Sequence, residues 1–129
     1  MKPEAVDAPG APAAAGFYVH AVRAGSLLFC SGQLGLDPGS GELVGEGAGG
    51  QAARALQNLE AVCTAAGTSL ARAVKLTLYL IDMSAFGEVN AVYEGFFAAG
   101  PPARVAVGVS ALPRGAAIMI DAVVALPGQ

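Results

Sequence analysis

The chain of 129 residues has little charge and few residues of the kinds that build metal or disulfide sites. Charged residues make up 13% of it, against about 25% in a typical globular domain. It has one histidine and two cysteines, Cys30 and Cys63, with no Cys-x-x-Cys pair. A disulfide framework and a metal site are therefore not expected. Both cysteines stand in apolar runs, which favours reduced thiols in the core.

The sequence also lacks a long apolar run and a targeting segment. No run approaches the roughly 18 apolar residues of a membrane-spanning helix. The N-terminal stretch MKPEAVDAPGAPAAAG contains acids and prolines and lacks the apolar region of a signal peptide. We therefore expect a soluble, cytoplasmic protein with no membrane partner.

There is no basic patch in the sequence either. Its 7 lysines and arginines are scattered, and 10 acids outnumber them, for a net charge of −3. Binding to a phosphate backbone depends on clustered positive charge, so the sequence argues against nucleic acid as a partner.

What the chain has in excess is apolar side chains, since 54% of its residues are hydrophobic. A length of 129 residues suits one domain, because two cores would each be too small to be stable. Residues 1–15, rich in alanine and proline, predict a flexible segment, and residues 16–129 predict a single domain. One small core does not need so many apolar residues, which predicts burial against copies of the same chain.

Hydrophobic periodicity predicts an α+β fold with the element order ββαβαββ. Alternating side chains indicate strands, and apolar residues at steps of three and four indicate helices. The predicted strands cover 18–25, 26–36, 74–81, 104–110 and 118–125, and the predicted helices cover 52–66 and 84–100. Two helices can cover one face of a mixed sheet. Several strands are apolar on both faces, so we expect another subunit to cover the second face.

Arg104 is the strongest candidate for a binding residue. It stands on a predicted strand, on the face away from the valines and beside the small residues Ala106 and Gly108. A guanidinium among small residues has room for a ligand, and its planar fork matches a carboxylate with two parallel hydrogen bonds. A structural ion pair, for example with Asp121, is the alternative.

Asp121 is the second candidate, because it interrupts the apolar strand MIDAVV. A carboxylate in such a strand must pair, accept hydrogen bonds or work as an acid or base. If the last two strands pair as a hairpin, Asp121 lies near Arg104.

Four further residues are weaker candidates. Tyr18 follows the flexible segment and can present a phenol to a ligand, although packing is an equal alternative. His20 is available for proton transfer or for a structural role. Gly32 ends a predicted strand and allows a ligand to approach the backbone amide. Asn90 stands beside the apolar face of the second helix, where it either points into a cleft or caps a neighbouring strand.

Three stretches stand in order along the chain: SGQLGLDPGSGELV, VNAVYEGFF and PPARVAVGVSALPRGAA. Together they resemble the RidA/YjgF family of enamine/imine deaminases, and the similarity extends over residues 16–126. The resemblance implies a chorismate-mutase-like fold and a homotrimer whose ligand clefts lie between subunits. It also implies hydrolysis of 2-aminoacrylate or related 2-imino acids to 2-keto acids and ammonia, without a metal or organic cofactor.

The resemblance also implies roles for individual residues. Arg104 is expected to bind the substrate carboxylate, and Asp121 and Tyr18 are expected to act with it in catalysis. The backbone near Gly32 and Ala106 and the side chain of Asn90 are expected to surround the substrate. His20 departs from the family's first motif and is expected to reshape the substrate cleft. The family commonly has cysteine where this chain has Ala106, and glutamate where it has Asp121.

These differences leave other functions open. One alternative is a RidA-like enzyme of a specialised pathway that acts on another carboxylate substrate. Another is a trimer that binds a ligand without catalysis. A nuclease or translation inhibitor is a further alternative, which the acidic net charge disfavours.

Overall fold

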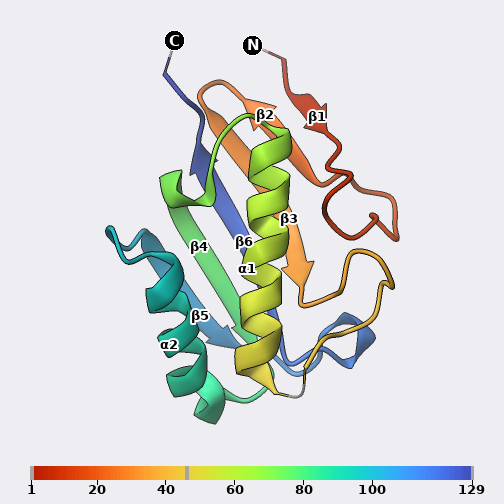
Figure 1. Cartoon of the computed structure of the whole chain (residues 1–129), viewed down its shortest axis with the longest axis vertical. Coiled ribbons are helices and arrows are strands. Elements are labelled where there is room, and N and C mark those ends of the chain that lie inside the picture. Colours follow the sequence, from red (N-terminus) through yellow and green to blue (C-terminus); the bar gives the residue numbers. More distant parts are fainter. Residues whose placement is uncertain (1, 46, 129) are drawn as a thin grey trace.

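The computed structural model describes residues 2–45 and 47–128, which form one six-stranded mixed sheet with two helices (Figure 1). The strands lie in the order β1-β2-β3-β6-β4-β5, and β4 and β5 are the parallel pair. The elements are β1 Glu4–Val6, β2 Ala21–Ala24, β3 Leu27–Leu34, α1 Ala48–Ala65, β4 Ala73–Leu80, α2 Phe86–Phe96, β5 Ala103–Gly108 and β6 Ile118–Ala125. The predicted α+β class is confirmed. No helix of the described residues is long and apolar enough to cross a membrane.

The N-terminal segment differs from the prediction. Residues 4–6 form β1, which pairs antiparallel with β2, and Val6, Ala8 and Ala11 are buried. The segment that the sequence predicts to be flexible therefore includes a short strand and buried side chains. The first predicted strand, over residues 18–25, is found as β2 and begins at Ala21. Small apolar side chains in an Ala/Pro-rich segment give no periodic signal, yet they fill space against the core and lose contact with water.

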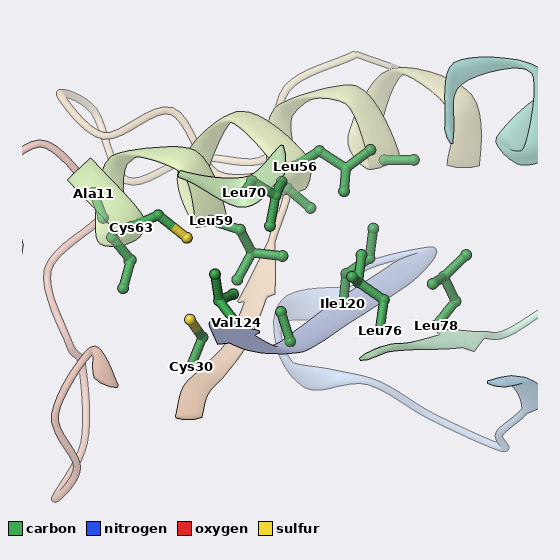
Figure 2. Close-up of a cluster of buried hydrophobic side chains, with 14 of the residues drawn as sticks. Ala11, Cys30, Leu56, Leu59, Cys63, Leu70, Leu76, Leu78, Ile120 and Val124 are labelled. Atoms are coloured by element: carbon green, nitrogen blue, oxygen red, sulfur yellow. The ribbon is translucent and has the colours of Figure 1, made fainter. Parts of the chain in front are cut away.

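The core lies between α1 and the sheet, as Figure 2 shows. Four positions of the predicted helix face are completely buried: Ala52, Leu56, Leu59 and Cys63. They face Leu28 of β3, the leucines of β4 and the aliphatic residues of β6, and β6 is buried at every second position along its length. This face of the sheet, which both helices cover, is called the helix face below (Figure 1).

The two cysteines meet in this core. Cys30 on β3 and Cys63 on α1 are both buried and free, which confirms the prediction of reduced core residues. A hydrogen bond with the Cys30 thiol, together with burial, raises the pKa of the Cys63 thiol well above its usual range. Cys63 therefore remains a thiol, and both buried cysteines pack as small apolar groups.

The opposite face of the sheet, called the open face below, is only partly covered. Phe29, Val105 and Val107 are 46%, 40% and 38% exposed, and strand register puts them on the same face as Tyr79 and Asp121. No helix of the described residues lies over these side chains. The sequence predicts that this chain has no element to cover the second face of the sheet, and the described residues of the single chain leave that face uncovered.

The last two strands do not pair as a hairpin, so the condition that would put Asp121 near Arg104 is not met within the single chain. β4 lies between β5 and β6, pairing parallel with the first and antiparallel with the second. The physical reason is the crossover: β4, α2 and β5 form a β-α-β unit, which makes β5 the parallel neighbour of β4 at the edge of the sheet. β6 pairs with the other edge of β4.

Candidate functional site

Arg104 lies on the edge strand β5, and its side chain points toward α2. It stands in register with Leu76 of β4, and Ala106 stands in register with Leu78. Paired residues share a face, so Arg104 and Ala106 both lie on the helix face, away from Val105 as the sequence predicts. Arg104 is half-buried there, at the edge that no further strand covers.

Three side chains of α2 hold the guanidinium of Arg104. Its Nη1 donates to Oδ1 of Asn90 at 2.8 Å, and its Cζ lies 4.7 Å from the centre of the Tyr93 ring and 5.0 Å from that of Phe86. These three residues recur at steps of four and three, so they share one face of the helix. Cation–π contacts with two rings and one hydrogen bond fix the orientation of the guanidinium.

A cavity of about 610 Å³ opens beside this cluster. Arg104, Asn90, Tyr93 and Glu94 line it, with Phe97, Ala98, Pro101 and Pro102. Among the described residues Asn90 is the hydrogen-bond acceptor of Arg104, so the guanidinium keeps N–H donors for a ligand. We call Arg104, Asn90, Phe86 and Tyr93 the arginine half-site.

Two neighbouring groups set the chemistry of the arginine half-site. Nδ2 of Asn90 donates to Oε2 of Glu94 at 3.1 Å, which turns the amide oxygen toward Arg104. Burial raises the pKa of the Tyr93 phenol, although Arg104 opposes the shift, and its hydroxyl has no hydrogen-bond partner among the described residues. Tyr93 is therefore a neutral ring beside the cation.

Asp121 lies on β6, on the open face. Its register partner on β4 is Thr77, and its Oδ2 accepts a hydrogen bond from the Tyr79 hydroxyl at 2.8 Å. This bond and the nearby carboxylate raise the pKa of Tyr79, so the phenol stays protonated and donates. No ion pair joins Asp121 to Arg104 among the described residues, because the two side chains lie on opposite faces of the sheet. The ion-pair alternative is therefore wrong for the single chain.

A β-bulge lies across from Asp121. Cys30 pairs with Ala122 and Gln33 with Ile120, so Ser31 and Gly32 together oppose Asp121. A Cβ on Gly32 would lie 2.9 Å from Sδ of Met119, so a side chain at this position would require the Met119 side chain to shift. Gly32 and Asp121, predicted separately, are thus neighbours.

Tyr18 stands before β2 and is 51% exposed. With Gly32, Arg114 and Met119 it lines a second cavity, of about 770 Å³, toward the open face. We call Tyr18, Gly32, Tyr79 and Asp121 the acid half-site. Gly32 connects its two parts, because it lines the cavity with Tyr18 and opposes Asp121 across the bulge.

His20 is a structural residue, which corrects its assignment to the substrate site. Its side chain is buried, Nδ1 accepts from the backbone N–H of Ala8 at 3.0 Å, and Nε2 donates to the carbonyl oxygen of Pro12 at 2.8 Å. Both ring nitrogens are therefore engaged in fixing the N-terminal segment, and His20 lines neither cavity.

The predicted site residues thus divide into two groups. The structure brings Arg104, Asn90 and Ala106 together on the helix face, and Gly32 and Asp121 on the open face, with Tyr18 at the cavity that Gly32 lines. The sequence analysis did not identify Tyr79 as a site residue. Two features of the sequence pointed to it: its place on the polar side of an alternating strand, and the need of Asp121 for a hydrogen-bond partner. Within residues 2–45 and 47–128, no three His, Cys, Asp or Glu side chains group as metal ligands.

Comparison with known proteins finds a family model, relatives and a solved structure that each match most of the chain. The family model described as endoribonuclease L-PSP matches residues 9–126. The chain is 46% identical to the RutC family protein y4sK of Sinorhizobium fredii, over 95% of this chain and 98% of that protein. It is also 46% identical to the 2-iminobutanoate/2-iminopropanoate deaminase of Mus musculus, over 88% of this chain and 84% of that protein. The crystal structure of RidA from an Antarctic Psychrobacter is similar with a TM-score of 0.91 and 40% identity, covering 95% and 99% of the two chains.

Proposed function

The chain belongs to the RidA/YjgF family, and we propose that it is an enamine/imine deaminase acting on 2-aminoacrylate or related 2-imino acids. The observation that carries the proposal is the arginine half-site, in which α2 holds Arg104 beside an open cavity. The name of the mouse relative supports this substrate class.

In the proposed reaction Arg104 binds the substrate carboxylate through two N–H groups. Water adds to the imine carbon, and the resulting carbinolamine expels ammonia to leave the 2-keto acid. Imines hydrolyse readily in water, so the protein needs only to hold the substrate, place one water and move protons. Asp121 is proposed as the group that accepts a proton from the water, and Tyr18 as a wall of the substrate cleft.

The proposed active site is shared between copies of the chain in a homotrimer. The arginine half-site lies on the helix face at the β5 edge, whereas Asp121 lies on the open face two strands away. A single chain therefore does not bring Arg104 and Asp121 to one substrate. The exposed Phe29, Val105 and Val107 supply apolar surface for association.

The assembly is tested by light scattering. We expect a mass of about three times the 12.7 kDa of one chain. A monomer mass at micromolar concentration would contradict the shared site.

The activity is tested by generating 2-aminoacrylate in situ with a serine dehydratase and following its loss. We expect the wild-type chain to accelerate the loss and Arg104→Ala to lower kcat/KM by roughly 100-fold, since two charge-assisted hydrogen bonds are removed. Arg72→Ala is the control, because Arg72 is an exposed arginine outside both cavities and the charge change is the same. No acceleration by the wild type would overturn the proposed function, and full activity of Arg104→Ala would overturn the role of Arg104.

A second candidate function is the hydrolysis or binding of a larger carboxylate substrate. The cavity beside Arg104 measures about 610 Å³, within the range of sites for much larger molecules than a three-carbon acid. A series of 2-keto acids of increasing chain length would separate the candidates, because bound ligand raises the melting temperature. Stronger stabilisation by the longer acids, without imine hydrolysis, would favour this function.

A further inference from the structure

The acid half-site contains a pair that neither the sequence nor the family resemblance identified. The hydroxyl of Tyr79 lies 2.8 Å from Oδ2 of Asp121, and Tyr79 is the only hydrogen-bond partner of this carboxylate among the described residues. Both side chains are half-buried on the open face. Oδ1 of Asp121 therefore has no partner within the described part of the chain.

The geometry of the sheet explains how the two side chains meet. Thr77 stands directly opposite Asp121 and Tyr79 stands opposite Met119, so Tyr79 and Asp121 are diagonal neighbours on one face. An aromatic side chain can span such a diagonal. The phenol thus reaches Asp121 from the β4 side, whereas the Ser31–Gly32 bulge lies on the β3 side.

This hydrogen bond makes the two oxygens of the Asp121 carboxylate inequivalent. Oδ2 accepts a hydrogen bond from a neutral phenol, which is a charge-assisted bond to an ionised carboxylate. The bond limits rotation of the Asp121 side chain and leaves Oδ1 as the oxygen available to a water or a substrate. A carboxylate on an open sheet face without such a bond would sample several orientations.

We propose that Tyr79 is a positioning residue, which holds Asp121 so that Oδ1 faces the reacting water. The proposal rests on the proposed deaminase function and on Asp121 as its proton acceptor. Tyr79 does not touch the substrate in this proposal and acts only through Asp121.

The test is a double-mutant cycle in the imine-loss assay, with Tyr79→Phe, Asp121→Asn and the double variant. We expect Tyr79→Phe to lower kcat by about tenfold and to leave KM within about twofold, because Arg104 still binds the carboxylate. The double variant is expected to be no slower than Asp121→Asn alone, since the phenol has no carboxylate left to hold. Thr64→Ala is the matched control: it deletes an exposed hydroxyl that donates to Glu60 on α1, and its kcat should equal that of the wild type.

Three results would overturn the proposal. In the first, Tyr79→Phe keeps the wild-type kcat. In the second, the losses of the two single variants multiply in the double variant, so that Tyr79 acts independently of Asp121. In the third, Tyr79→Phe changes the mass of the assembly that light scattering measures. The pair would then stabilise the contact between subunits and would not position a water. A wild-type chain without activity would instead overturn the proposed function, and this inference with it.

Discussion

The helix face and the open face of the sheet use the same strands for different purposes. On β4, Leu76, Leu78 and Leu80 are fully buried under the helices, whereas Thr77 and Tyr79 between them are only half-buried. The helix face holds the core and, at its edge, an arginine oriented by α2. The open face holds an acid, its tyrosine partner and exposed valines. One face is covered by helices of the same chain, whereas the other is the surface on which the proposed assembly depends.

The largest effect should come from the helix face. Leu78→Ala should lower the free energy of unfolding by about 2–5 kcal/mol, because it removes a fully buried side chain and leaves a cavity. Thr77→Ala, on the same strand but on the open face, should cost less than about 1 kcal/mol. Urea denaturation of both variants measures the difference. Equal losses would break the distinction between the two faces.

The next effect tests what covers the open face. Val107→Asp puts a charge on the apolar surface and should shift the proposed trimer to single chains, with the circular dichroism spectrum of the folded protein retained. Ala91→Asp adds the same charge to the exposed side of α2 and should leave the mass unchanged. Light scattering separates the two. Should Val107→Asp keep the wild-type mass, the open face would not be the contact surface.

The smallest effect concerns the Tyr79–Asp121 pair at high pH. The pKa of Tyr79 is raised above its ordinary value of about 10, first by the hydrogen bond to Asp121. The folded state therefore holds this proton more tightly than the unfolded state. The resulting stability is fully present below pH of about 10 and is lost as the pH rises through the raised pKa.

An absorbance titration of the phenols measures this effect. The difference between the wild type and Tyr79→Phe isolates Tyr79, and Asp121→Asn should return its titration toward lower pH. If Tyr79 titrates at its ordinary pKa in the wild type, the pair does not form in solution.

Local patterns were enough to predict most of the helix face. The spacing of Ala52, Leu56, Leu59 and Cys63 predicted one side of α1, and all four are buried. Such patterns work because the period of a helix or strand decides which side chains share a face. The orientation of Arg104 away from Val105 follows from the same rule.

Pairings between distant segments were not predictable in this way. β1 has three residues and depends on β2, which lies fifteen positions farther along the chain. β5 and β6 follow each other along the chain but do not pair, because β4 takes the place between them. No local pattern predicts which strand will lie between two others in the sheet, because every strand offers the same backbone N–H and C=O groups to a neighbour.

The sequence alone was enough to predict the fold class, the alternation that buries the leucines of β4, and an arginine with small neighbours on a strand. The strand order and the packing of α2 were needed to show that Arg104 lies against Phe86, Asn90 and Tyr93, and that Asp121 pairs with Tyr79 on the other face. Periodicity is a property of neighbouring residues, whereas strand order places side chains from distant segments side by side. The division of the proposed site into two half-sites follows from that order.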